Sequence, residues 1–458
     1  MTRGTGLLPR TLPCRTALIA AAATLILLLG VRGHAAAQAY QVKTVAYFNG
    51  ANGATGDEPA AGLIADGKGD YYGTTESGGA TGTGTIFEYS ASGGLRTLAA
   101  FNALSTGYIP CGDLLTNGNG TFYGTTQSGG TYGDGTIYQY SASGGIQTLA
   151  SFNGINGAVP HSDLVMDGSG NLYAAVEYGG PGWNPINANG WGNGTIVKWS
   201  ASGGLQAVVT FNGTNGANPV CDLLPDGHGG FYGTTTGGGP YYPALSAGAL
   251  FDYSDSGGLQ IITSFPLYEN AQGIEPGGAN DTAVLQPYGP LVPDGKGGFY
   301  GYVRKLFADG VVYLCDYLPS GGIQLLAAWD TASPTALISD GHGGVYGTTQ
   351  WSSLYPPTVG DNNGNFFEYS PSTGFQTLAT FNGADGSYPL GLVPDGEGDF
   401  YGTTQAGGIG FTGMPGTGAG TIFELVPASV PEPPASLSVI AMGCALALAR
   451  VLRLRRHA

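Results

Sequence analysis

The chain has 458 residues, of which 84 are glycine and 27 are tyrosine, and only 10% are charged. This composition is typical of many short strands joined by tight turns, and the regular recurrence of aromatic residues excludes a disordered chain. Eight of the 15 basic residues lie in the two terminal segments, so the region between them carries seven basic and 31 acidic residues, a net charge of −24. A field of that sign argues against nucleic acid and anionic lipid as partners and favours cations.

Residues 1–39 are predicted to form a secretory signal peptide. Three arginines lead into an apolar run over residues 17–31, and the small residues that follow suit cleavage after Ala37 or Ala39. The run is short for a membrane span, which disfavours an uncleaved anchor. We therefore expect export across the inner membrane and processing by a signal peptidase.

Seven copies of a YGTT-like phrase mark an internal repeat. The central residues of these phrases are Gly73, Gly124, Ala174, Gly233, Gly301, Gly347 and Gly402. The spacing of 46 to 68 residues matches the blade of a propeller. Each unit predicts four short strands, which are a DLLPD-like segment, FYGTT, GTIFEYS and GLQTLASF. The sequence therefore predicts an all-β fold, a seven-bladed β-propeller of four-stranded antiparallel blades over residues 40–427.

The first predicted strand of each unit is the DLLPD-like segment. Its seven copies are Leu63–Asp66, Asp113–Asn117, Asp163–Asp167, Asp222–Asp226, Pro290–Asp294, Ala336–Asp340 and Gly391–Asp395. The fourth strands end at Phe48, Phe101, Phe152, Phe211, Phe265, Trp329 and Phe381. In the first units we expect the core to include Tyr72, Ile86, Phe87, Leu98 and Phe101.

The phase of the repeat predicts how the ring closes. Residues 41–50 read as a fourth strand without the three that should precede it, and residues 420–426 read as a third strand without a fourth. If the N-terminal strand joins the last blade, both gaps close and no blade is left with an open edge. We therefore expect a closed ring rather than an open array of sheets.

The last 31 residues, 428–458, read as a sorting tail. Pro431, Glu432 and Pro433 precede an apolar stretch over residues 435–449, and an arginine cluster follows it, with Arg453, Arg455 and Arg456. An apolar stretch followed by arginines anchors transiently in a bilayer with the arginines on the cytoplasmic side. The arrangement resembles the PEP-CTERM sorting signal. That resemblance implies an exosortase-type processing enzyme, a Gram-negative envelope, and delivery to the outer surface or the extracellular matrix.

The repeat itself resembles the GloVer tandem repeat of choice-of-anchor proteins. The residues that carry the resemblance are GTIFEYS at 84–90, the FNG triplets, and the DG-G-FYGTT phrases at 226–235 and 395–404. The third and fifth units depart from the pattern, with AAV at 174–176 and GYV at 301–303. The family implies a repeat architecture and surface export, and no defined catalytic activity.

Asp-Gly turns recur between the first and second strands and predict type I′ hairpins. A calcium loop is the sharper alternative, and Asp66, Asp70, Asp395 and Asp399 are its candidates. Calcium needs about six to eight oxygen ligands, and each turn offers one or two carboxylates, so we favour hairpin turns and predict no cofactor.

Other polar residues have structural interpretations. His228 and His342 recur at one turn position and are expected to be exposed, and His161 stands alone before a strand. Acidic residues recur with the repeat on the third strands. We expect their carboxylates to accept hydrogen bonds from the backbone of a neighbouring blade. They are Glu88, Asp252, Glu368 and Glu424. Three cysteines in the repeat region, Cys111, Cys221 and Cys315, are expected to be buried and unpaired.

The loops between the second and third strands and between the fourth and first strands vary in length, and together they form one face of the ring. Aromatic residues gather on this face, where they suit stacking on sugar rings or protein contact, although each could instead cover the ring mouth. The candidates for this binding face are Tyr178, Trp183, Trp191, Tyr241, Tyr242, Tyr268, Trp351 and Tyr355.

The sequence favours a non-catalytic surface or matrix protein that presents this variable face to an extracellular polysaccharide or a surface protein. One alternative is a propeller-fold polysaccharide lyase or hydrolase, which would need carboxylate, His or Arg side chains clustered around the central channel. The scarcity of Arg and His disfavours it. Another alternative is a cation-stabilised structural adhesin.

Overall fold

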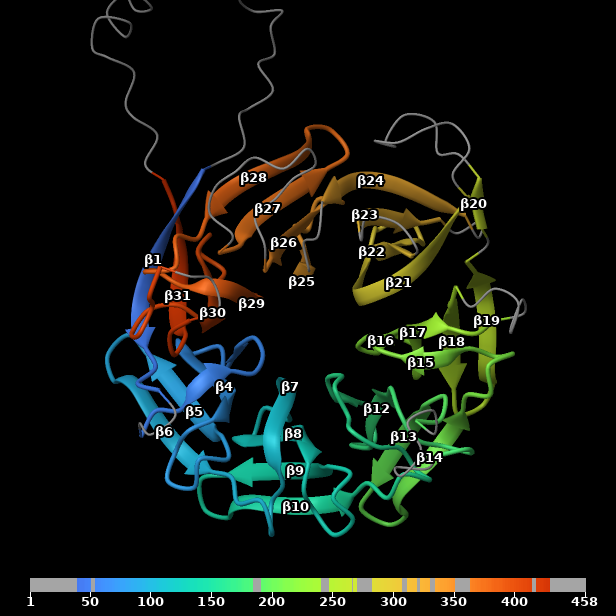
Figure 1. Ribbon diagram of the computed structural model, residues 1–458, viewed down its shortest axis with the longest axis horizontal. Helices are drawn as coiled ribbons and strands as arrows, with labels where there is room; N and C mark the ends of the chain where they lie inside the picture. The colour runs from blue at the N-terminus through green and yellow to red at the C-terminus, as the bar shows by residue number, and fades with distance from the viewer. Residues whose placement is uncertain are drawn as a thin grey trace, which may run out of the picture. The chain divides into compact units, whose positions relative to one another are not determined.

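A computed structural model of the chain describes residues 39–50, 54–183, 191–239, 247–265, 267–269, 282–306, 311–318, 322–329, 334–350, 363–413 and 417–428. Within these ranges the chain is all-β, with seven antiparallel blades arranged as a β-propeller (Figure 1). Both predicted terminal signals lie outside the described residues. No helix in the described part is long and apolar enough to cross a membrane.

Each blade runs from an inner first strand to an outer fourth strand. The first strands are β2 (Asp57–Pro59) with β3 (Ile64–Ala65), β7 (Tyr108–Thr116), β11 (Val165–Met166), β15 (Ala217–Pro219) with β16 (Leu224–Pro225), β21 (Thr282–Pro293), β25 (Pro334–Ser339) and β29 (Ser387–Pro394). The second strands are β4 (Asp70–Ser77), β8 (Thr121–Ser128), β12 (Leu172–Val176), β17 (Gly230–Gly237), β22 (Phe299–Leu306), β26 (Val345–Thr349) and β30 (Phe400–Ala406).

The third strands carry the GTIFEYS pattern, and the fourth strands lie at the rim. The third strands are β5 (Thr85–Ser90), β9 (Thr136–Ser141), β13 (Thr195–Ser200), β18 (Ala249–Ser254), β23 (Val312–Tyr317), β27 (Asn365–Ser370) and β31 (Thr421–Pro427). The fourth strands are β6 (Gly94–Ala100), β10 (Gly145–Ser151), β14 (Gly204–Thr210), β19 (Gly258–Ser264), β24 (Ile323–Trp329), β28 (Gly374–Thr380) and β1 (Tyr40–Tyr47). A short additional strand, β20 (Leu267–Glu269), pairs with β21.

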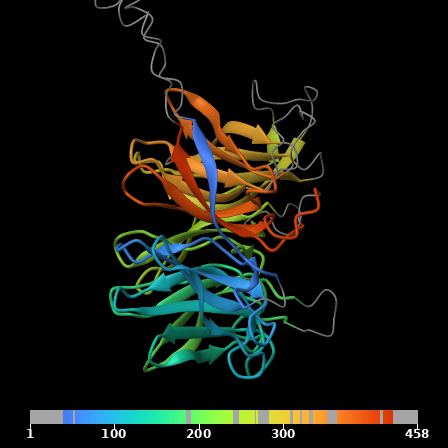
Figure 2. The same ribbon diagram turned by 90° about the vertical axis from the view of Figure 1, so that its left-hand side faces the viewer.

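The N-terminal strand closes the ring as predicted. β1 pairs antiparallel with β31 over seven residue pairs, from Tyr40 opposite Pro427 to Tyr47 opposite Thr421, and the sheet order is β1-β31-β30-β29. Figure 2 shows the blue N-terminal strand lying along the orange and red strands of the last blade. The edge of β31 that the last repeat would leave open is therefore covered.

The inner strands differ in length from the sequence prediction: β7 and β21 begin before the predicted segments, whereas β11 covers only Val165–Met166 of the predicted Asp163–Asp167. β7 starts at Tyr108, five residues before the predicted Asp113, and its pairing with β8 is interrupted between Cys111 and Leu115. The sequence predicted the part of β7 after this irregularity, where apolar residues alternate regularly. It did not predict the part before it. In the fifth blade β21 reaches back to Thr282 because the inserted segment pairs with the extended end of β22.

Glycine at the centre of YGTT makes room for an aromatic ring of the third strand. A Cβ on Gly233 would lie 2.4 Å from Cζ of Phe251, its cross-strand partner, which is closer than real contacts allow. In the third blade, Ala174 replaces this glycine. Its cross-strand partner is Val197, whose smaller side chain leaves room for the Cβ of alanine. The two positions therefore share one volume inside the blade.

Aromatic side chains join neighbouring blades. The phenylalanine that ends a fourth strand packs edge-on against a third-strand ring of the next blade, with Phe48 5.0 Å from Phe87 and Phe101 4.9 Å from Tyr138 between ring centroids. Of the predicted core residues, Ile86, Phe87 and Phe101 are fully buried, and Tyr72 and Leu98 are partly buried.

The turns between first and second strands are hairpins, but the type I′ prediction is wrong. Asp66 N–H donates to Asp70 C=O, so the loop holds three residues, and the two positive φ angles belong to Gly67 (75°) and Gly69 (98°). Asp66 keeps an ordinary backbone because its carboxylate accepts the amides of Lys68 and Asp70 at 2.7 and 3.2 Å. This cap is an Asx-type bond.

Candidate functional site

A cavity of about 860 Å³ lies at the centre of the ring, and all seven blades contribute to its wall. The lining comes mainly from the beginnings of first strands and the ends of second strands. In an antiparallel blade these two positions lie toward the loops that form the variable face. The cavity therefore belongs to the same end of the ring as the predicted binding face.

Three aspartates in the wall connect consecutive blades through carboxylate to amide hydrogen bonds. Asp113 Oδ1 accepts the N–H of Gly62 at 2.6 Å, Asp163 Oδ1 accepts the N–H of Asp113 at 2.5 Å, and Asp222 Oδ1 accepts the N–H of Asp163 at 2.8 Å. Such charge-assisted bonds are short and strong. The first four blades are thus linked at the channel.

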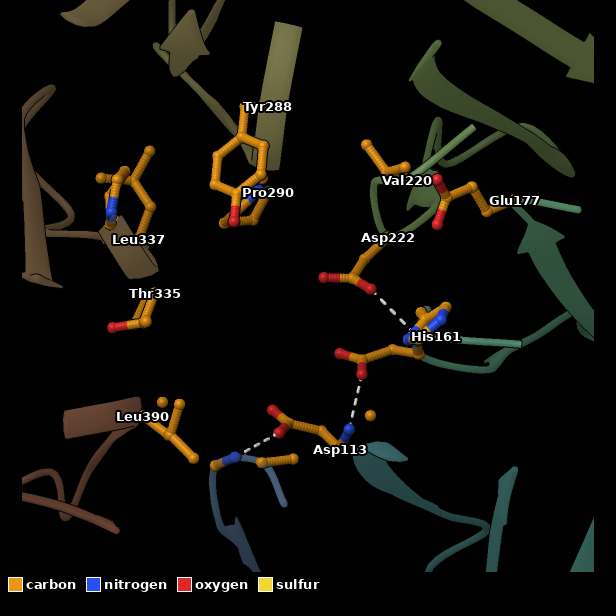
Figure 3. A pocket seen from close by; sticks show the side chains of 18 of the residues that line it. Asp113, His161, Glu177, Val220, Asp222, Tyr288, Pro290, Thr335, Leu337 and Leu390 are labelled. Carbon is orange, nitrogen blue, oxygen red and sulfur yellow. Dashed lines mark hydrogen bonds between the residues drawn. The ribbon is translucent and has the colours of Figure 1, made fainter. Parts of the chain in front are cut away.

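The second oxygen of each labelled aspartate faces the cavity. In Figure 3, one oxygen of Asp113 and one of Asp222 lie on the dashed bonds, and the other oxygen of each points into the open space. Among the described residues, the second oxygen of Asp113 and that of Asp163 accept no hydrogen bond from the protein. The aspartates therefore offer acceptors beyond those that hold the blades together.

The environment of these carboxyl groups favours their protonated form. Burial, followed by the negative charge of Asp222, raises the pKa of Asp113 to about 6, and the hydrogen bond from Gly62 opposes the shift. Burial and the charges of Asp222 and Asp113 raise the pKa of Asp163 well above its ordinary value. Burial also raises the pKa of Asp222. Few positively charged side chains line the wall, so little positive charge offsets the repulsion among these carboxyl groups.

The wall opposite the aspartates carries apolar and polar side chains. Pro290, Leu337 and Leu390 come from the fifth, sixth and seventh blades, and Figure 3 shows Leu337 across the cavity from Asp222. Arg304 also lines the cavity, and its Nη2 donates to Gln286 Oε1 at 3.0 Å. The cavity therefore has an anionic side and a side on which Leu337 and Leu390 lie with Thr335 and Arg304.

Three predicted face residues of the third blade form an aromatic cluster at this cavity. The ring centroids of Tyr178 and Trp191 are 5.2 Å apart, and those of Trp183 and Trp191 are 5.9 Å apart. Tyr178 and its neighbour Glu177 line the cavity. Trp191 is 49% exposed, whereas Trp183 covers Gly154, where a Cβ would lie 1.9 Å from Cδ1 of the indole. Trp183 therefore packs the loop, and Trp191 presents a ring to solvent.

The other predicted face residues cannot be placed in this cluster. Tyr241, Tyr242, Trp351 and Tyr355 lie outside the described residues. Tyr268 belongs to β20, where its backbone pairs opposite Ala283, and its side chain lies outside the description.

Two of the four candidate calcium ligands, Asp66 and Asp395, serve as turn caps. Asp395 Oδ1 accepts the amides of Glu397 and Asp399 at 2.7 and 3.1 Å, as Asp66 does in the first blade. Across the described residues, no group of three or more His, Cys, Asp or Glu side chains is arranged to hold a metal ion.

The structure shows where the predicted histidines and cysteines lie. His228 and His342 are exposed in their turns as expected, but His161 lines the central cavity, where its Nδ1 lies 3.1 Å from Gln127 Nε2. All three cysteines are buried and free, as predicted.

The prediction that third-strand acids bond backbone between blades is wrong for Glu88 and Glu424. Glu88 pairs with the Arg96 side chain on the adjacent strand of its own blade, and Glu424 accepts hydrogen bonds from Lys43 and Tyr401 in the last blade. Side chains on adjacent strands of the same blade supply hydrogen-bond donors to both carboxylates, so these carboxylates do not bond the backbone of the next blade.

Sequence reasoning missed the three cavity aspartates. They stand directly before the conserved-looking leucine of the first strand in three consecutive units, where the other units have Gly62, Pro290, Ala336 and Gly391. That contrast within one repeat position was the available signal. The carboxylate, His and Arg cluster expected for an enzyme is thus present in part, although the few Arg and His argued against it.

The fold and the cavity define a class: a seven-bladed β-propeller with an acidic central cavity flanked by aromatic residues. Residues 34–187 match the family model of the Gloeobacter/Verrucomicrobia repeat, which supports the GloVer-type resemblance for the first two units and part of the third. No curated protein matches the chain in sequence.

Solved structures with a similar fold are distant in sequence. One, described as the extracellular domain of a one component system from B. thetaiotaomicron, has a TM-score of 0.51 and 14% identity over 85% of this chain. This chain covers 40% of the length of that structure. Another, described as a 6-phosphogluconolactonase from Bacteroides uniformis, has a TM-score of 0.44 and 14% identity, over 81% of this chain and 100% of that one. At these identities the likeness shows the fold alone.

Proposed function

We propose that the protein is an exported, non-catalytic glycan-binding module of the cell surface or extracellular matrix. The observation that carries this proposal is the exposed Trp191 ring, held against Tyr178 at the edge of a cavity with polar acceptors. Flat aromatic rings stack on the apolar faces of sugars, while carboxylates and amides accept hydrogen bonds from sugar hydroxyls. A protein partner on the same face is less favoured than a glycan.

A glycan array with the full-length protein tests this proposal. We expect binding to a restricted set of glycans, and a loss of about tenfold or more in affinity for Trp191→Ala, since stacking and burial of an indole contribute on the order of 1–3 kcal/mol. Tyr132→Ala is the matched control, because Tyr132 is an exposed aromatic, 63% accessible, that does not line the cavity. Binding that survives Trp191→Ala unchanged, or an array without any signal, contradicts the proposal.

Export and sorting form a second part of the proposal, supported by the sequence of the two ends. The signal peptide over residues 1–39 would be removed by signal peptidase, and the tail with Pro431, Glu432 and Pro433 by an exosortase-type enzyme. Replacement of Pro431–Pro433 by alanines should leave an uncleaved, membrane-associated form in cell fractionation. A variant that reaches the surface as the parent does would count against this sorting route.

A propeller-fold polysaccharide lyase or hydrolase is the second candidate, because carboxyl groups with raised pKa values in a cavity are typical of acid–base sites. Its test is the release of new reducing or unsaturated ends from any glycan that the array identifies. Release that disappears in Asp163→Asn would replace the non-catalytic proposal.

A further inference from the structure

The cavity and its aromatic edge suggest which kind of sugar the protein selects, an inference that rests on the proposed glycan binding. The cavity of about 860 Å³ is within the ~300–1,000 Å³ range of small-molecule sites, so it has room for one or two sugar rings. Tyr178 belongs both to the cavity wall and to the cluster with Trp191, which connects the anionic interior with the exposed aromatic ring. A bound glycan chain can therefore place one unit inside and the next on the aromatic edge.

We propose that the cavity binds an amino sugar that carries a free, protonated amine, with the ammonium group against Asp113, Asp163 and Asp222 and the following sugar ring against Tyr178 and Trp191. The acceptors for the ammonium group are the carboxylate oxygens that the amides of Gly62 and Asp113 leave unused. An ammonium group has three N–H donors, and carboxyl groups from three adjacent blades line this side of the cavity.

The electrostatics of the wall support this choice of substituent. The charge of Asp222 raises the pKa values of Asp113 and Asp163, and the charge of Asp113 raises that of Asp163, so ionised carboxyl groups repel one another here and the empty cavity favours their protonated forms. A bound cation relieves the repulsion among the ionised carboxyl groups. A neutral N-acetyl group in the place of the ammonium group does not. A uronic acid would add a further negative charge and is disfavoured.

The distribution of charge around the site points the same way. Of the seven basic residues between the terminal segments, Lys43 and Lys198 pair with acids of the blades, and Arg96 pairs with Glu88 away from the cavity. Arg304 bonds Gln286 in the cavity wall. The net charge of −24 over this part of the chain attracts a cationic polymer and repels an anionic one.

Calorimetry with two β-1,4-linked glucosamine trimers tests the inference. One trimer carries free amines, the other is fully N-acetylated, and the buffer is near neutral, above the pKa of about 6 of the Asp113 carboxyl group, so that this group is ionised. We expect the full-length protein to bind the free-amine trimer about tenfold or more tightly than the acetylated one, as for a charge-assisted bond to a carboxylate. The preference should weaken as salt concentration rises.

Asp163→Asn is the decisive variant, because an asparagine Oδ1 can still accept the amide of Asp113 but cannot ionise when a cation binds. We expect it to remove most of the preference for free amines and to change binding of the acetylated trimer less than twofold. Asp340→Asn is the matched control: Asp340 also accepts backbone amides, from His342 and Gly344, but in a turn away from the cavity. It should leave both affinities unchanged.

The outcomes separate this inference from the proposed function. Equal affinity for the two trimers, tighter binding of the acetylated trimer, or a preference that persists in Asp163→Asn overturns the amino-sugar inference and leaves glycan binding intact. Failure of both trimers to bind a protein that binds other glycans on the array also overturns it. An array without any glycan signal removes the proposed function, and the inference with it.

Discussion

Lys43 Nζ lies 2.6 Å from Glu424 Oε2, although the two residues are 381 positions apart in the chain. Lys43 belongs to β1 and Glu424 to β31, and the pair lies opposite in the register that closes the ring. Lys43 is largely exposed, so the ion pair adds little by itself, and closure depends on the seven residue pairs between β1 and β31 and on Phe48, which is fully buried against Phe87.

Removal of the closing strand should open the ring. A chain that lacks residues 40–48 leaves the edge of β31 unpaired, and we expect a lower melting temperature and a tendency to aggregate. A synthetic peptide of residues 39–50, added in trans, should restore the melting temperature in a concentration-dependent way. The same peptide with Phe48→Ala should bind at least about 100-fold more weakly, because loss of a buried phenylalanine costs about 3–5 kcal/mol. A truncated chain that melts like the parent would contradict the closure.

The shared volume of the YGTT glycine and the third-strand ring can be tested by a double-mutant cycle. Gly233→Ala should destabilise the protein by about 1–3 kcal/mol because its Cβ would overlap Phe251. In the Phe251→Val background, the same change should cost less than about 0.5 kcal/mol, as the Ala174 and Val197 pair of the third blade indicates. Denaturant unfolding of the four proteins measures the coupling, and additive effects would show that the two positions do not compete for space.

The cavity carboxyl group of Asp113 should make stability depend on pH. Its pKa rises from 3.8 to about 6 in the folded protein, mainly because of burial and then because of the charge of Asp222. Between these values the folded state holds a proton that the unfolded state has lost, so this group makes stability fall as pH rises across that window. Asp113→Asn cannot ionise and can still accept the Gly62 amide, so its melting temperature should fall less between about pH 4 and pH 6. An Asp113→Asn profile parallel to the parent's would refute the assignment.

The three cysteines should be unreactive in the folded protein. Burial raises the pKa of the Cys111 thiol to about 12 and that of Cys221 to about 11, and it raises the pKa of Cys315 as well. A thiolate is the reactive form, so a thiol reagent should modify none of the three until the protein unfolds. Mass spectrometry after native and denatured labelling measures this, and fast native labelling of Cys111 or Cys221 would disagree with the burial.

The sequence by itself determined the number of blades, the order of their strands and the way the ring closes. Each of these properties depends on a local pattern: the YGTT phrases count the blades, the alternation of apolar residues marks the strands, and the isolated fourth strand before Phe48 requires a partner after Gly420. Strand patterns report burial and pairing within one blade, where contacting residues are close in sequence. They also placed Tyr178, Trp183 and Trp191 on one variable face, since loop length and composition are local properties.

The tertiary structure alone decided what the centre of the ring contains. Asp113, Asp163 and Asp222 are 50 and 59 residues apart, and they meet because adjacent blades bring equivalent positions of their inner strands together. In sequence these aspartates begin the DLLPD-like segment and Asp66 or Asp395 end it, and the pattern does not show that only the latter use their carboxylates to accept their own loop amides. A one-dimensional pattern shows that a position recurs, but it does not show whether the side chain turns toward its own hairpin or toward the axis that seven hairpins share.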